Sequence, residues 1–194
     1  MKIIAVRHGE TKENKARVLM GHMHGTLSKA GYAQIAKLAH SLKGEKIDAI
    51  FSSDLDRAAE TARGIARYHK APISYVKALR EQNYGIFQGQ SLEALITAEK
   101  SSNLKITEFR PSNGESLMDV RNRVERFVKR LNKKYGDKTI LLSTHSGVIR
   151  CLISIYLDMP MEKVLQMDPK NTEIVVMEIN GTRARLVKFK AKPD

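Results

Sequence analysis

The sequence predicts an α/β fold, a three-layer α/β/α sandwich with a mostly parallel central sheet. Apolar, β-branched runs alternate along the chain with segments whose apolar residues recur at helical spacing, a pattern typical of a sheet covered by helices on both faces. At 194 residues the chain is long enough for one sizeable core. No linker or low-complexity tract divides it, so we expect a single domain over residues 1–194.

The expected elements can be assigned in order. Strands are predicted where short apolar runs occur, at residues 2–7, 47–53, 73–76, 138–144, 173–179 and 184–189. Helices are predicted where the apolar spacing is three or four residues, at residues 28–44, 54–69, 91–100, 114–136 and 148–157. Ser28 is the expected N-cap of the first helix, and Gly44 follows its end. The last two strands form an expected hairpin, because Asn180 and Gly181 between them are a strong turn signal.

Charge and cysteine content narrow the class of protein. Lys and Arg number 34 against 21 Asp and Glu, a net charge of +13, which favours an anionic partner or a basic surface. The charges are scattered, and stacking aromatic residues are few, so we do not expect nucleic acid as a partner. No apolar run approaches the length of a membrane span, so we do not expect a membrane partner either. A lone cysteine, Cys151, cannot form an internal disulfide. Without a signal-peptide segment, these features predict a cytoplasmic protein.

Two histidines stand at the ends of predicted strands. His8 follows the strand 2–7, and His145 follows the strand 138–144, each with glycine one or two residues later. Ligands of α/β proteins bind beyond the carboxyl ends of the strands, so both imidazoles are expected on one rim. Strand-end histidines alone are more often structural, and this pattern leaves both readings open.

Six segments in order resemble motifs of the histidine phosphatase superfamily, which includes cofactor-dependent phosphoglycerate mutases and small-metabolite phosphatases. "VRHGETKEN" resembles the RHG signature of that family, and "IFSSDLDRAAETA" resembles its YSSxLxRAxxTA segment. The other four are "LSKAGYAQ", "LREQNYGIFQG", "NGESLMDV" and "LLSTHSGVIR". The resemblance covers nearly the whole chain and implies a phosphoglycerate mutase-like fold.

The resemblance also implies roles for five residues. His8 would be the nucleophile that forms a phosphohistidine, and Glu81 would be the proton donor to the leaving oxygen. Arg7 and Arg57 would hold the phosphoryl oxygens, because guanidinium groups fit phosphate with paired donors. His145 would be a second imidazole on the phosphoryl group, positively charged when the anion is bound.

Further candidate substrate contacts are Thr11, Asn14, Gly21, His22 and Ser146. Simpler interpretations compete with several assignments. Arg57 could pair with Glu60 or Asp54 on a helix surface, Asn14 could bond its own turn, and Glu81 could be solvated. His22 and His24 have a spacing that can share a metal, but no further ligands accompany them, so we expect no metal.

Phosphate monoester hydrolysis is the expected function, and phosphoglycerate mutase is the alternative. Mutases of the family typically carry arginine directly after the catalytic glutamate and contain a longer middle segment. This chain has Gln82 there and is compact, which favours a phosphatase. We expect a small phosphorylated metabolite as substrate and no cofactor, 2,3-bisphosphoglycerate being needed only by a mutase. A non-catalytic basic binding module is a remote alternative, and a homodimer is left open.

Overall fold

The fold is built on a six-stranded sheet in the order β3-β2-β4-β1-β5-β6. The computed structural model describes residues 1–180 and 183–188. The strands are β1 (Lys2–Arg7), β2 (Ala49–Ser52), β3 (Ile73–Tyr75), β4 (Thr139–Thr144), β5 (Ile174–Asn180) and β6 (Arg183–Lys188). The first four in space are parallel, β5 runs antiparallel to them beside β1, and β6 at the edge pairs antiparallel with β5. The mostly parallel sheet is confirmed.

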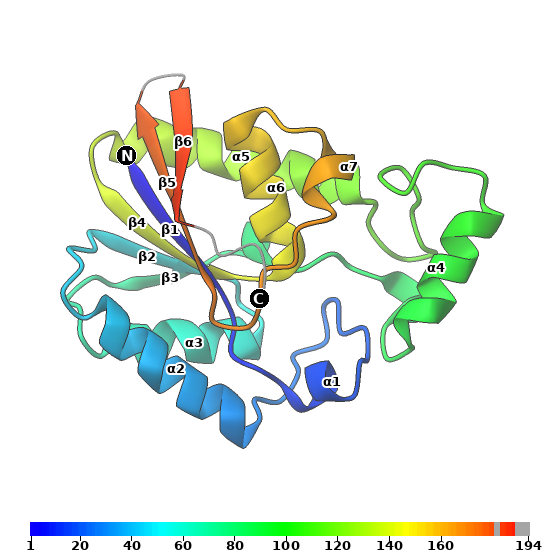
Figure 1. Ribbon diagram of the computed structural model, residues 1–194, viewed down its shortest axis with the longest axis horizontal. Helices are drawn as coiled ribbons and strands as arrows, with labels where there is room; N and C mark the ends of the chain where they lie inside the picture. The colour runs from blue at the N-terminus through cyan, green and yellow to red at the C-terminus, as the bar shows by residue number, and fades with distance from the viewer. Residues whose placement is uncertain (181–182, 189–194) are drawn as a thin grey trace.

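Helices cover both faces of this sheet, which confirms the three layers (Figure 1). One face carries α2 (Lys29–Leu42) and α3 (Asp56–Ala66), and the other carries α5 (Leu117–Tyr135) and α6 (Ser146–Leu157). The excursion that holds α4 (Leu92–Ser101) extends to the side of the sandwich, beyond α7 (Met161–Val164). No helix of the described residues is long and apolar enough to cross a membrane.

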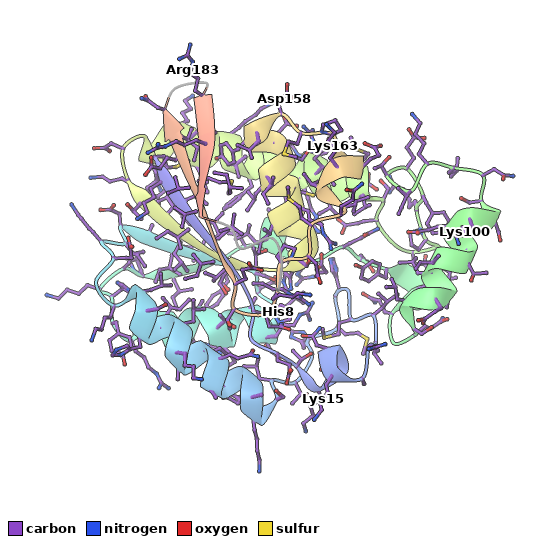
Figure 2. All side chains as sticks on the ribbon, in the orientation of Figure 1. His8, Lys15, Lys100, Asp158, Lys163 and Arg183 are labelled. Carbon is purple, nitrogen blue, oxygen red and sulfur yellow. The ribbon has the colours of Figure 1, made fainter. Side chains whose placement is uncertain are left out.

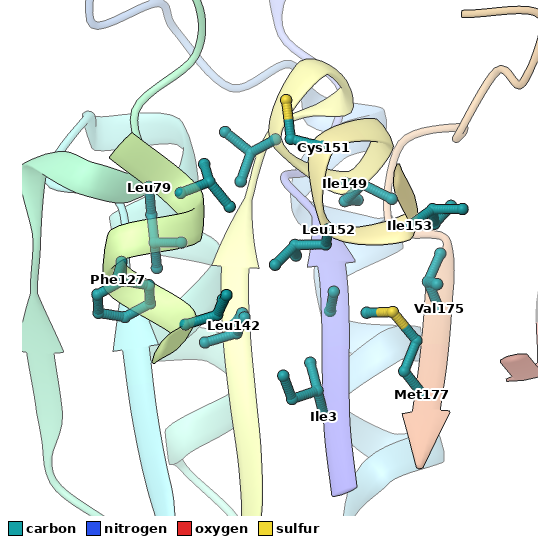
Figure 3. Close-up of a cluster of buried hydrophobic side chains, with 14 of the residues drawn as sticks. Ile3, Leu79, Phe127, Leu142, Ile149, Cys151, Leu152, Ile153, Val175 and Met177 are labelled. Atoms are coloured by element: carbon teal, nitrogen blue, oxygen red, sulfur yellow. The ribbon is translucent and has the colours of Figure 1, made fainter. Parts of the chain in front are cut away.

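Alternation along the strands builds a core on each face of the sheet. Ile3 and Ala5 of β1 pack with α5 and α6, in a cluster that also contains Leu142, Phe127 and Leu152 (Figure 3). Their neighbours Ile4 and Val6 belong to the opposite cluster, which packs against α2 and α3. Because β1 is buried on both faces, its sequence is a continuous apolar run rather than an alternating one.

Several short elements were not expected from the sequence. They are α1 (Lys12–Lys15), α7 and two 3₁₀ turns at Lys77–Leu79 and Gly85–Phe87. Each is only a single turn, too short for hydrophobic periodicity to reveal. The β5–β6 hairpin is confirmed by its antiparallel pairing, while Gly181 of its predicted turn lies outside the described residues.

The positive charge is distributed around the molecule. Lys15, Lys100, Lys163 and Arg183 lie at separate places on the periphery, on α1, α4, α7 and β6 (Figure 2). On β6, Arg183 and Arg185 are exposed.

The N-caps of α5 and α4 allow the contribution of a side-chain cap to stability to be tested. Ser116 caps α5 by accepting a hydrogen bond from the Asp119 amide at 3.1 Å, and the Asp119 carboxylate accepts one from the Ser116 amide at 2.7 Å. Ser116→Ala should lower the free energy of unfolding by about 1 kcal/mol, measured by urea denaturation. Ser91→Ala is the matched control, because Ser91 is the N-cap of α4 without a side-chain cap bond. Equal losses would contradict this account of the cap.

Candidate active site

The pairing of β1 with β4 brings the two strand-end histidines together. The register aligns Arg7 with Thr144, and the ladder continues with a hydrogen bond from the His8 amide to the Thr144 carbonyl at 3.0 Å. The next residue of each strand is therefore a histidine at the carboxyl edge of the sheet. The ring centroids of His8 and His145 lie 5.2 Å apart, and Figure 2 shows His8 near the middle of the molecule.

The backbone of its own loop orients the His8 ring. Nδ1 lies 2.8 Å from the Gly9 carbonyl oxygen, and since a carbonyl can only accept, Nδ1 is the protonated nitrogen. The lone pair of the neutral ring is then on Nε2, and Nε of Arg57 donates to it at 3.3 Å. The Gly9 amide is itself fixed by Thr61 Oγ1 at 3.1 Å. His8 thus presents an unprotonated Nε2 to the space beyond the sheet.

Burial and neighbouring cations keep both histidines neutral. His8 is 2% exposed and His145 is fully buried. Burial lowers the pKa of His8 well below its ordinary value, with Arg57 and Arg7 adding to the effect. Burial lowers the pKa of His145 in the same way, followed by the charge of Arg57. His145 Nε2 lies 2.9 Å from Ser53 Oγ, and its buried Nδ1 has no hydrogen-bond partner among the described residues.

Arg57 is 1% exposed and lies against His8. Its Nη2 donates to the Gly21 carbonyl at 2.8 Å, and Nη1 donates to the carbonyls of Met23 and His24. Gly21 has φ +51°, a conformation that favours glycine. Burial lowers the pKa of Arg57 to about 10, which still leaves it charged near neutral pH. The surface ion pair considered for Arg57 is not formed.

The acidic residues considered as partners of Arg57 bind other arginines. Arg80 Nη2 pairs with Asp54 at 2.5 Å, and Arg63 pairs with Glu60. Arg7, the residue before His8, also lines the cavity. Its Nη1 donates to the Pro169 carbonyl at 2.7 Å, and its buried Nε has no partner in the described part of the chain.

Glu81 reaches the start of α6 because residue 147 is glycine. Its Oε2 accepts from the Gly147 amide at 3.3 Å, and its Oε1 accepts from the Gln82 amide at 3.0 Å. A Cβ atom at residue 147 would come within 2.3 Å of Oε1. The carboxylate is therefore held by two backbone donors and is not a freely solvated side chain.

An arginine on α5 supports the loop that carries Glu81. Arg123 Nη1 donates to the Ala78 carbonyl at 2.8 Å, and Nη2 donates to the Glu81 carbonyl at 2.9 Å. Arg123 Nε also pairs with Glu115 at 2.9 Å, and Glu115 accepts from the Asn83 amide at 3.0 Å. These contacts fix the backbone on both sides of Glu81.

The side chains around His8 line a cavity of about 230 Å³. Seven of the residues predicted to contact substrate or reacting atoms line it: Arg7, His8, Asn14, Gly21, Arg57, Glu81 and Ser146. His145 lies behind His8 and does not line the cavity. Asn14 was expected either to contact substrate or to bond its own turn, and the structure is compatible with both. It lines the cavity, and its Oδ1 accepts from the Thr11 amide at 3.2 Å and from Asn171 Nδ2 at 3.3 Å.

Two predicted substrate contacts do not line the cavity. The buried Thr11 hydroxyl accepts from the Asn14 amide at 3.0 Å and caps α1. His22 Nε2 bonds the Glu81 carbonyl at 2.9 Å and so supports the loop from behind. His24 has a different partner, with its Nδ1 3.0 Å from Asp56. Among the described residues, no group of three or more His, Cys, Asp or Glu is placed to hold a metal ion.

Comparisons with known proteins identify the family. The model of the histidine phosphatase superfamily, branch 1, matches residues 3–192. The chain belongs to this superfamily. It is 36% identical over 158 residues to phosphoglycerate mutase-like protein 4 of Arabidopsis thaliana, covering 78% of this chain and 69% of that protein. It is 30% identical over 166 residues to the adenosylcobalamin/alpha-ribazole phosphatase of Escherichia coli, covering 84% and 82%.

A solved structure gives the same result at the level of the fold. The alpha-ribazole phosphatase of Shigella flexneri superposes with a TM-score of 0.87 at 29% identity, over 96% of this chain and 94% of that one. The expected phosphoglycerate mutase-like fold is confirmed.

Sequence reasoning missed two polar side chains of the cavity wall in this histidine phosphatase. Tyr84 and Arg150 both line it, and burial raises the pKa of the Tyr84 hydroxyl, with Glu81 adding to the rise. Arg150 lies one helical turn after Ser146 and Gly147, on the same side of α6. That spacing of three to four residues was the available signal, because side chains one turn apart share a helix face.

The two buried neutral histidines predict a loss of stability in mild acid. The pKa of each is near 6.5 in the unfolded chain and lower in the folded one. Below about pH 6.5 the unfolded chain therefore binds more protons, and each histidine lowers the free energy of unfolding by up to about 1.4 kcal/mol per pH unit. Urea denaturation between pH 7 and pH 5 measures the slope of the unfolding free energy against pH. His8→Gln should reduce this slope by up to about 1.4 kcal/mol per pH unit, the contribution of one proton.

Asn171→Ala is the control for this titration. It removes the hydrogen bond from Asn171 Nδ2 to the His8 carbonyl, 2.9 Å long, but it removes no titratable group. It should lower stability by a similar amount at every pH. A slope that His8→Gln leaves unchanged would mean that His8 is protonated in the folded chain.

Proposed function

We propose that this chain hydrolyses phosphate monoesters of small metabolites through a phosphohistidine at His8. The observation that carries the proposal is the state of the His8 ring, with Nδ1 bonded to the Gly9 carbonyl and Nε2 unprotonated beside Arg57. A neutral imidazole with its lone pair directed into a cationic cavity is suited to attack phosphorus. The phosphatases among its relatives support the same reaction class.

Cationic groups around His8 are suited to hold the phosphoryl oxygens. Arg7 Nε is a buried donor without a partner among the described residues, and leaving such a donor unpaired costs free energy that a bound anion would recover. Arg57 Nε now bonds Nε2 of His8 and would turn to a phosphoryl oxygen as the N–P bond forms. The negative charge of that group would favour protonation of the neighbouring His145, so its positive charge is expected only in the bound state.

Two chemical steps complete the turnover. In the first, Nε2 of His8 forms a bond to phosphorus while the bond to the ester oxygen breaks, and protonated Glu81 gives its proton to the departing oxygen. In the second, the Glu81 carboxylate takes a proton from water, whose oxygen attacks phosphorus. The N–P bond breaks, the electron pair returns to Nε2, and inorganic phosphate leaves.

This mechanism needs no metal or organic cofactor, because guanidinium groups supply the positive charge that phosphoryl transfer requires. Hydrolysis is favoured over the mutase reaction because the residue after Glu81 adds no cation to the cavity. Gln82 is 7% exposed and donates from Nε2 to the Glu115 carbonyl at 2.8 Å. Efficient isomerisation of 3-phosphoglycerate that depends on 2,3-bisphosphoglycerate would support the mutase instead.

A cytoplasmic location stays a prediction. The single cysteine, Cys151, is buried and free.

A phosphohistidine should be trapped on brief mixing with labelled substrate. The label should be stable in alkali and lost in acid, because an N–P bond hydrolyses in acid. His8→Ala should abolish the label and the release of phosphate while the circular dichroism spectrum stays native. His40→Ala, a change at an exposed histidine of α2, should keep both. Near-full turnover by His8→Ala would refute the mechanism.

Glu81→Gln separates proton donation from binding. Glutamine keeps the shape and its single side-chain oxygen can accept one of the two backbone bonds, but it cannot donate a proton to the leaving oxygen. The value of kcat/KM should fall about 10²–10⁴-fold for alkyl phosphates. It should fall much less for nitrophenyl phosphate, whose leaving oxygen is stable as an anion. Equal losses on both substrates would assign Glu81 a positioning role only.

A further inference from the structure

Arg150 is a third guanidinium group in the wall of the cavity, which the mechanism above does not use. Its Nε donates to the Met167 carbonyl at 2.7 Å, and this bond ties the side chain to the segment between α7 and β5. Asp168 is close enough to feel its charge, but the Asp168 carboxylate bonds Lys170. No carboxylate of the described residues forms an ion pair with Arg150, so its terminal nitrogens are available to an anion.

The charges in the cavity wall exceed what one phosphate monoester can balance during the reaction. Arg7, Arg57 and Arg150 supply three positive charges, and Glu81 is the one acidic residue of the lining. While Glu81 holds the proton that it gives to the leaving oxygen, the wall carries three charges against about two on the phosphoryl group. One cation is left over. Arg150 is only partly exposed and has no carboxylate partner among the described residues, so it is the cation free to meet a second anionic group.

We propose that the preferred substrates carry a second anionic group, a carboxylate or a second phosphate, and that Arg150 binds it. This inference rests on the proposed function and names the substrate class of the same site. The guanidinium fork fits either group with paired donors. The remaining wall includes Val18, Leu19 and Leu92, which offer no charge, so Arg150 alone can discriminate an acidic from a neutral alcohol part. The cavity of about 230 Å³ has room for an alcohol part beside the phosphoryl group.

A purely structural role is the competing explanation for Arg150. Its bond to the Met167 carbonyl could serve only to anchor the chain after α7. In that case a substitution would lower stability and reduce the rates with all substrates by the same factor. A substrate-binding role instead makes the loss depend on the charge of the alcohol part.

The test compares three substrates of similar length: 3-phosphooxypropanoate, 1,3-propanediol bisphosphate and n-butyl phosphate. The enzyme should favour one or both doubly anionic esters over n-butyl phosphate by at least about 30-fold in kcat/KM, the factor expected for a close charge pair. The ester that is favoured identifies the second group as carboxylate or phosphate. Arg150→Gln should remove most of this preference, with a much smaller loss on n-butyl phosphate, and Arg150→Lys should restore part of it.

Controls separate this inference from the proposed function. Arg126→Gln removes an exposed arginine of α5 that does not line the cavity, and it should keep the preference. Thermal unfolding of Arg150→Gln reports any structural loss. Turnover of all three esters without preference, or an equal loss on all three in Arg150→Gln, would overturn the role of Arg150 and leave the phosphatase function intact.

A binding measurement covers the case in which no ester turns over. That result would refute the proposed function, whereas calorimetry of the same esters with His8→Ala would still report on Arg150. Tighter binding of a doubly anionic ester, lost in the double variant with Arg150→Gln, would support the inference. Equal binding of all three esters would overturn it.

Discussion

The parallel pairing of β1 with β4 is the constraint on which the site depends. These two strands are far apart in the sequence, and their backbone hydrogen bonds hold them in one register, with Arg7 opposite Thr144. A shift of one residue would turn His8 or His145 to the other face of the sheet and would exchange the two cores, since alternate residues point in opposite directions. The buried residues on both faces of β1 therefore specify the placement of both histidines.

Burial then determines the chemistry of the groups at this edge. His8, His145 and Arg57 are nearly inaccessible to water, so the imidazoles are neutral and the electrostatic effect of each arginine is strong. Carbonyl groups of the loop after α1 accept hydrogen bonds from Arg57. The same residue that faces the reacting nitrogen thus holds the loop, and the shape of the cavity is coupled to the charge inside it.

Support for Glu81 comes from outside the cavity. Arg123, Glu115 and His22 contact the backbone of its loop from α5 and from the loop after α1, and Gly147 leaves room for its carboxylate. A proton donor must stay within reach of a leaving oxygen, and a loop without such contacts would allow many positions. Residues that do not touch substrate are therefore part of what makes this site specific.

The sequence by itself determined the fold class, nearly every long element and the edge of the sheet where the site lies. These properties follow from local patterns, namely the period of the apolar residues, the N-cap Ser28 and the residues at strand ends. The family motifs in the sequence singled out His8, Arg57 and Glu81, whose roles stay predictions. Tertiary structure decided what local patterns cannot encode: that Thr11 and His22 bond loop backbone and do not line the cavity, that Arg57 bonds loop carbonyls instead of Glu60 or Asp54, and that Arg150 joins the wall. Each depends on contacts between residues distant in the chain, and only folding brings them together.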